Sequence, residues 1–335
     1  GTLAQAWSRA DWLHNTLPVW RKLVSPILNS LAHTMAKLTP LPEEVEAQLA
    51  PMMRASGAAV FATQVGAALG RIAARSLSAG EVGLPLTPEP VVALIPANIE
   101  EFSAGLDLPF GDIILYLALR EAARARLFKA APWLGPQLIA LVEHYAREIS
   151  IDPTALRNAV EDQLGGFTQS SQFMQVGQVI ADSLFNPERT PEQDEVLGRL
   201  ETLVALIEGW VDAVVGQVVK DRMPTAPALA ELVARRRAEA GLGEPLRSLL
   251  GLELTPRRVR EARRLWSATR NYRGAAGRDG SWGHPDALPS DADLSDPLRF
   301  AEHGAAVAEP DDFDAELAKL LGETGTDPSA PEADL

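Results

Sequence analysis

Residues 112–128 read DIILYLALREAARARLF, a stretch with apolar residues on nearly every face of a helix. Such a helix is buried, because it has no continuous polar face to turn toward water. One stripe of it, at spacings of three and four residues, holds Ile113, Leu117, Arg120, Arg124 and Phe128. Arg120 and Arg124 therefore face the interior or a cleft, where each needs an acidic partner.

The acidic partners are predicted on a second apolar helix. Between Leu203 and Val219 its charged residues are Glu208 and Asp212, which are four apart and so share a face. A guanidinium matches a carboxylate with two parallel hydrogen bonds, so pairing between the two helices is geometrically favourable. A buried ion-pair network of this kind can serve only to fix how the helices pack, and this interpretation stays open beside a functional one.

The pentad Arg120-Glu121-Ala122-Ala123-Arg124 has the spacing of a zinc-peptidase motif with both metal ligands exchanged. In His-Glu-x-x-His, two histidines bind zinc from one face of a helix and the glutamate acts as general base. Glu121 stands at the position of the base, and arginines stand at the positions of the histidines. An arginine stays protonated and has no lone pair to give a metal. The pattern therefore indicates a hydrolase scaffold and argues against zinc at the same positions.

Composition excludes several classes of function. The chain of 335 residues has a net charge of −14 and a pI near 4.9, which disfavours nucleic acid because phosphates repel an acidic protein. It has no cysteine, so disulfides, thiolate metal sites and a cysteine nucleophile are excluded, and a cytoplasmic location is expected. The start shows no signal-peptide pattern. The two acids inside the run at 203–219 favour a buried helix over a membrane span.

The pattern along the chain predicts a mainly α protein with a small β element and an extended C-terminal segment. Helical apolar spacing near the N-terminus is interrupted at Pro18 and Pro26. Gly66 and Gly70, four apart among alanines, predict a close contact between helices. The short run VVALIP at residues 91–96 is the best candidate for a strand.

One compact domain with four parts is expected. N-terminal helices occupy residues 1–78, a helical core residues 79–273, a C-terminal wrap residues 274–321, and a disordered acidic tail residues 322–335. Within the wrap, Phe313 to Leu321 has a helical pattern, and the loop Trp282-Gly-His-Pro-Asp is expected to be clamped onto the domain by its tryptophan.

Five segments carry a more specific resemblance: Leu94–Ile99, Tyr116–Phe128, Pro132–Leu134, Ile207–Asp212 and Trp282–Asp286. Together they resemble an actinobacterial family of zincin-like hydrolases, described as zinc-dependent metalloproteases, with relatives linked to deazaflavin-coenzyme biosynthesis. The resemblance runs roughly from Trp7 to Leu321.

This resemblance implies a zincin-like helical fold in which one helix supplies histidine ligands and a glutamate base, and a later helix supplies a glutamate as third ligand. By position, Glu121 corresponds to the base and Glu208 to the third ligand. Arg120 and Arg124 stand where the histidines would be, which leaves at most one of the three ligands that a catalytic zinc needs. We therefore expect a metallopeptidase-family protein without zinc or another cofactor, in which the arginines occupy the metal's place beside Glu208 and Asp212. Its expected role is non-catalytic binding or scaffolding, with a peptide or protein as partner.

Two alternatives stay open. An active metal-dependent hydrolase would use Glu121 with unusual ligands, such as His144 and Glu208. A purely structural helical protein would use the same charges only for packing. An open, polar-lined cleft above Glu121 favours a binding role, whereas a filled core there favours the structural one.

Two arginine clusters, at residues 235–237 and residues 257–264, are expected on solvated faces. They lack the interleaved aromatic residues of a platform that stacks nucleic-acid bases. We expect them to pair with nearby acids and with the acidic C-terminal region.

Overall fold

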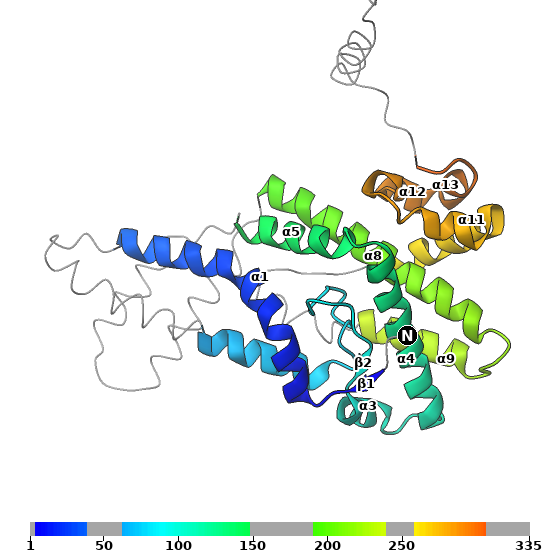
Figure 1. The fold of residues 1–335 in the computed structure, drawn as a ribbon, viewed down its shortest axis with the longest axis horizontal. Coiled ribbons are helices and arrows are strands. Elements are labelled where there is room, and N and C mark those ends of the chain that lie inside the picture. Colours follow the sequence, from blue (N-terminus) through cyan, green and yellow to red (C-terminus); the bar gives the residue numbers. More distant parts are fainter. Residues whose placement is uncertain (1–3, 39–61, 148–189, 239–257, 306–335) are drawn as a thin grey trace, which may run out of the picture.

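The computed structural model describes residues 4–38, 62–147, 190–238 and 258–305. These residues are mainly helical with a small sheet (Figure 1), so the predicted fold class is confirmed. The helices are α1 (Arg9–Leu38), a helix over residues 62–75, α3 (Pro96–Ser103), α4 (Phe110–Ala130), α5 (Leu134–Arg147), α8 (Pro191–Val219), α9 (Ala226–Ala238), α11 (Val259–Gly280), the 3-10 turn η1 (Pro285–Ala287), α12 (Asp291–Ser295) and α13 (Pro297–His303).

The sheet ties the N-terminus to the loop that precedes α3. Strand β1 (Gln5–Ala6) lies parallel to β2 (Ala93–Leu94), with Gln5 opposite Ala93. β2 is the centre of the strand predicted at residues 91–96, and it stops where Pro96 begins α3. Ser78 bridges to Leu94 from the other side, and this pairing fixes the loop around residue 78 beside α4.

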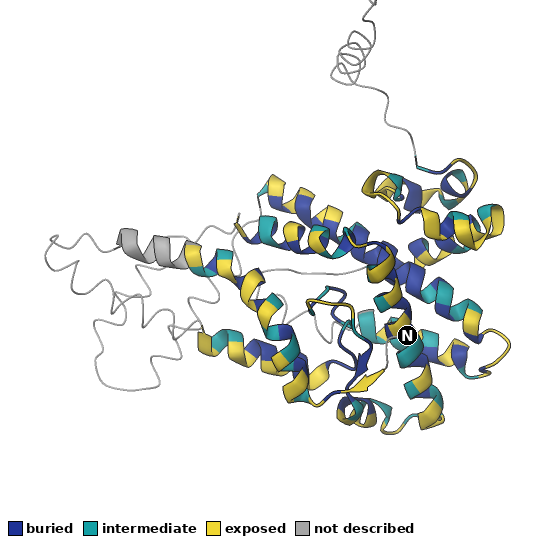
Figure 2. Cartoon of the chain, in the orientation of Figure 1, coloured by how far each residue is buried: buried dark blue, intermediate teal, exposed yellow. Residues whose placement is uncertain are grey.

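Helix α8 forms the centre of the core. It packs against α4, α5 and α11, and every residue from 203 to 211 is buried, as Figure 2 shows by its dark stretch. By length and composition it is the one described helix that could cross a membrane, yet 67% of that apolar window is buried inside the protein. This burial agrees with the prediction of a core helix.

The chain is more helical than its proline and glycine content indicates. Helix α1 continues through Pro18 and Pro26 and changes direction along its length (Figure 1), as a helix does where prolines remove backbone hydrogen bonds. Beyond Gly274, the described residues hold the end of α11 and the helices α12 and α13 rather than an extended wrap. Gly274 has a φ of 71°, which produces a kink in α11 and not its end.

Aromatic residues attach this C-terminal layer to the core. Trp282 is buried and stacks on Trp266 of α11 with ring centroids 5.3 Å apart, and Trp266 also meets Phe300 of α13 edge-on. The expected clamp by Trp282 is therefore present. The four-part division remains a prediction. Residues 306–335, which include the helix predicted at Phe313–Leu321 and the predicted tail at 322–335, lie outside the described residues.

The close helix contact lies at Gly209, not at Gly66 and Gly70. Both of those glycines are exposed, and among the described residues a Cβ on either would meet no atom within 4 Å. A Cβ at Gly209 would lie 2.5 Å from Cβ of Ala262 and 2.7 Å from the backbone nitrogen of Arg263. The missing side chain therefore sets how closely α8 and α11 approach.

Gly209→Ala is expected to destabilise the protein by about 1–3 kcal/mol, because overpacking at this contact exceeds the gain in helix propensity. Gly198→Ala, at an exposed position on the same helix with nothing within 4 Å of the added Cβ, is the control and is expected to be neutral or stabilising by up to about 1 kcal/mol. Urea unfolding of both variants measures the difference. Equal effects at the two positions would contradict the close contact.

Candidate functional site

Two buried helices bring the predicted charged residues together. α4 carries Arg120, Glu121 and Arg124, and α8 packs against it with Glu208 and Asp212. The first four of these residues are only 3–5% exposed. Charges buried to this degree must be paired to be tolerated.

Arg124 bridges the two glutamates. Its Nη2 and Nε donate to Oε1 of Glu208 at 2.7 and 3.0 Å, and its Nη1 donates to Oε2 of Glu121 at 2.5 Å. One guanidinium thus joins a carboxylate of its own helix to a carboxylate of α8. Arg124 is the central cation of the site.

Arg120 extends the network along α8. Its Nη2 donates to Oε2 of Glu208 at 2.8 Å, and its Nη1 donates to Asp212. Arg237 of α9 then donates to both oxygens of Asp212, at 3.1 and 3.0 Å. The charges alternate from Glu121 to Arg237 and sum to zero, as a buried network requires.

Two residues that the sequence did not single out hold Glu121. Ser78 Oγ donates to its Oε2 at 2.8 Å, and the backbone nitrogen of Gly80 donates to its Oε1 at 2.7 Å. A Cβ on Gly80 would lie 2.8 Å from Cδ of Arg124, so only glycine lets the loop approach this closely. The sequence also did not predict that Arg237 pairs with Asp212, because the only pattern that marked this residue was the arginine cluster at residues 235–237.

The network shifts the acidities of its members in opposite directions. Burial alone would raise the pKa of Glu208, but Arg124 and Arg120 outweigh it and lower the pKa. Burial would also raise the pKa of Asp212, but Arg120 and Arg237 outweigh burial and lower it. For Glu121 burial prevails over Arg124, and the pKa is raised.

Cavities lie at both ends of the network. One, of about 400 Å³, has Glu121 and Arg124 among its lining and a wall from the proline-rich residues 84–90. The other, of about 980 Å³, reaches Asp212 and Arg237. The first of these is a cleft above Glu121, and its walls are mostly apolar.

The described residues offer no cluster of three His, Asp or Glu side chains that could hold a metal ion. His144 of α5 lies away from the network, with its Nε2 2.9 Å from Oε1 of Glu192. Glu192 precedes Glu208 by 16 residues on α8, about 24 Å along the helix axis. The structure therefore does not bring His144 and Glu208 to one site.

A family model described as zincin-like metallopeptidase matches residues 1–301. No curated protein and no solved structure matches the chain. Every residue of the charged network lies within the matched range.

Stability is expected to fall in acid because Glu208 and Asp212 have folded-state pKa values below their ordinary values of 4.5 and 3.8. The stability they contribute is present above those values and is lost as pH falls through the folded-state pKa values. Glu121 acts in the opposite sense, since its raised pKa makes its contribution largest below pH 4.5.

Urea unfolding between about pH 3 and pH 7 tests this dependence. Glu208→Gln is expected to reduce the acid slope by up to about 1.4 kcal/mol per pH unit, the value for one proton. Glu195→Gln, at an exposed position on the same helix, is the control and should keep the wild-type slope. An unchanged slope in Glu208→Gln would show that this carboxylate does not titrate as described.

Proposed function

This chain belongs to the zincin-like metallopeptidase family, and we propose that it is a non-catalytic member in which a guanidinium takes the place of the zinc ion. The observation that carries the proposal is the position of Arg124. Its guanidinium contacts both Glu121 and Glu208, the two carboxylates that correspond to the base and the third ligand. A fixed positive charge thus stands where the resemblance implies a metal.

The residues at this place do not fit a zinc ion. A catalytic zinc takes three protein ligands with lone pairs, and arginine has none to give. Glu208 is the remaining ligand candidate, and both of its oxygens already accept hydrogen bonds from Arg120 or Arg124. A zinc ion there would have to displace two buried cations, which would then lack partners.

Glu121 is also poorly suited to activate water. A general base must reach the proton that it abstracts with a free lone pair. Its two oxygens accept hydrogen bonds from Ser78, Gly80 and Arg124, and the side chain is only 3% exposed. These contacts support a structural role for Glu121 rather than a role as general base in hydrolysis.

The cleft beside the network supports a binding role. A purely architectural network predicts a filled core above Glu121, whereas a cavity of about 400 Å³ lies there. Its walls are mostly apolar, not polar as expected, and include Leu84, Leu86 and Phe128. The charged residues of the lining are Glu89, Glu121, Arg124 and Lys129. Such a surface suits an apolar segment of a peptide or protein better than a small charged substrate.

The segments that carry the resemblance also support an origin in the actinobacterial branch of the family, with its link to deazaflavin-coenzyme biosynthesis. The absence of cysteine supports the cytoplasm as its compartment. Both statements are part of the proposal.

Restoring imidazoles is expected to create a zinc site. The double variant Arg120→His, Arg124→His supplies two ligands beside Glu208 and should bind zinc at least about 100-fold more tightly than the wild type. The matched control is Arg120→His, Arg126→His, because Arg126 is exposed on the same helix. Competition with a chromophoric zinc chelator measures the affinity.

Wild-type protein should bind no stoichiometric zinc in the same assay and should cleave no peptide. One tightly bound zinc per wild-type chain, lost in Glu208→Gln, would overturn the proposal.

A further inference from the structure

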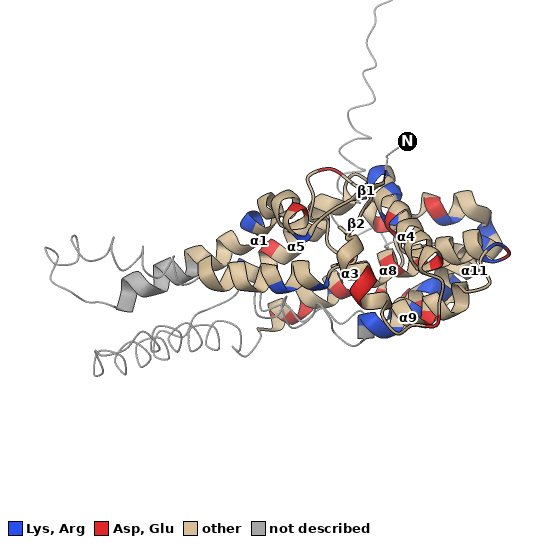
Figure 3. Cartoon of the chain, turned by 90° about the horizontal axis from the view of Figure 1, so that it is seen from below, with Lys and Arg blue, Asp and Glu red and all other residues tan. Residues whose placement is uncertain are grey.

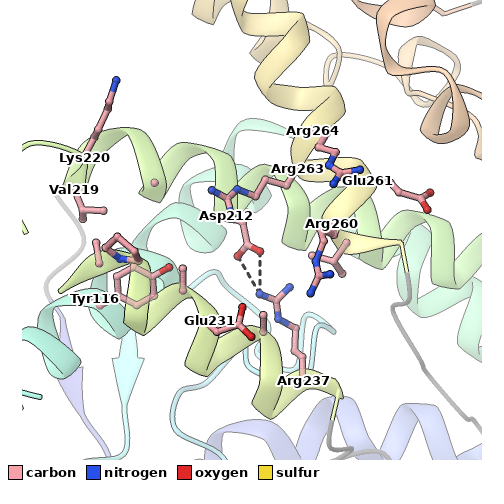
Figure 4. A pocket seen from close by; sticks show the side chains of 16 residues that line it. Tyr116, Asp212, Val219, Lys220, Glu231, Arg237, Arg260, Glu261, Arg263 and Arg264 are labelled. Atoms are coloured by element: carbon pink, nitrogen blue, oxygen red, sulfur yellow. Dashed lines mark hydrogen bonds and ion pairs between the residues drawn. The ribbon is translucent and has the colours of Figure 1, made fainter. Parts of the chain in front are cut away.

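A groove of about 980 Å³ lies on the side of the molecule formed by α8, α9 and α11 (Figure 4). Its apolar surface comes from small and aliphatic side chains of these helices, including Val219, Ala226, Ala230 and Val259. An apolar surface of this kind suits the apolar face of a helix.

Basic residues surround this apolar surface. Arg260, Arg263 and Arg264 come from the first two turns of α11, and Lys220 follows the end of α8 (Figure 4). Figure 3 shows Lys and Arg in blue on α9 and α11. None of these four residues forms an ion pair with another residue of the described ranges. The start of α11 adds a partial positive charge of its own. Within the described part of the chain, the groove thus combines an apolar surface with cations that have no acidic partner.

The acids that line the groove are already engaged. Asp212 accepts hydrogen bonds from Arg120 and Arg237, Glu261 accepts one from Arg258, and Glu231 forms an ion pair with Arg235 at 3.6 Å. They cannot neutralise the arginines of α11 without giving up these partners. The groove is therefore suited to an anionic ligand from outside the described residues.

The sequence offers a matching ligand within the same chain. Residues 306–335 hold nine acids and one lysine, a net charge of −8 out of −14 for the whole chain. Within them, residues 311–321 read DDFDAELAKLL, with Phe313, Leu317 and Leu320 at helical spacing and acids between and before them. This is the pattern of an acidic amphipathic helix.

The chain is long enough to reach. Gly304 lies beside the guanidinium of Arg273 on α11. Arg273 follows Arg264 by nine residues and Arg260 by 13. That separation is about 14–20 Å along the helix, and passing round a helix adds about 10 Å. Residues 306–310 span about 17 Å when extended, and a helix over residues 311–321 adds about 16 Å, so a chain leaving Ala305 reaches Arg264 and Arg260 within this helix.

We propose that the groove binds an acidic amphipathic peptide and that residues 311–321 of this chain are its occupant. The apolar residues of the segment would cover the apolar surface, and its carboxylates would pair with Arg260, Arg263 and Arg264. The same chemistry would let an acidic segment of a partner protein compete for the groove. This role does not depend on whether the α4 site binds metal.

Disulfide trapping in the full-length chain tests the proposal, because the natural sequence has no cysteine to interfere. Ala234→Cys places one thiol in the groove, and Ala315→Cys places the other in the segment. In a glutathione redox buffer, the effective concentration of this pair should exceed that of the control pair Ala234→Cys, Ala330→Cys by at least about tenfold. The excess should shrink at about 1 M salt, which screens exposed charges.

Charge reversal separates a specific contact from chance proximity. A triple variant should lower trapping to the level of the control pair; it combines Arg260→Glu, Arg263→Glu and Arg264→Glu in one chain. Adding Asp311→Arg, Asp312→Arg, Asp314→Arg should restore it, which also shows that the groove variant is folded. Arg270→Glu, at an exposed position further along α11, should have no effect.

Three outcomes would overturn the proposal. They are equal trapping at positions 315 and 330, trapping that is insensitive to the charges of α11, and a disulfide that joins two chains instead of closing within one.

Discussion

The guanidinium of Arg124 between Glu121 and Glu208 is the interaction on which the rest of the site depends. It joins α4 to α8, and through Glu121 it holds the loop at Ser78 and Gly80. Removing one charge from such a buried network leaves its partners without compensation, at a cost of about 3–5 kcal/mol. The apolar residues around the network bury the helices, and the network determines how α4 and α8 align.

The sequence was sufficient to predict which helices carry the site and which charges meet. Two helices that are apolar nearly all round, one with two arginines on a face and the other with two acids, have few other ways to satisfy those charges. Ser78 and Gly80 could not be predicted, because their place beside Glu121 follows from the pairing of Ser78 with β2. The small-residue pattern at Gly66 and Gly70 indicated that a backbone could approach closely, but the approach occurs at Gly209, where α11 supplies the neighbouring helix.

In the proposed function, the guanidinium of Arg124 takes over the structural role of a metal ion but cannot perform the metal's chemistry. A zinc ion and a guanidinium both supply a positive charge that draws carboxylates from two helices together. The guanidinium offers no open coordination position, so it neither activates water nor polarises a carbonyl. The cavities at the two ends of the network are then the candidate binding sites. One, beside Glu121, is mostly apolar, and the other, near Asp212, is bordered by arginines.

The most direct measurement is a double-mutant cycle between Arg124 and Glu208, using methionine at both positions and urea unfolding at neutral pH. Each single variant is predicted to lose about 3–5 kcal/mol of unfolding free energy, because it leaves a buried charge without its main partner. The double variant is predicted to lose less than the sum of the two by at least about 2 kcal/mol. Additive losses, within about 0.5 kcal/mol, would contradict the claim that this guanidinium organises the site.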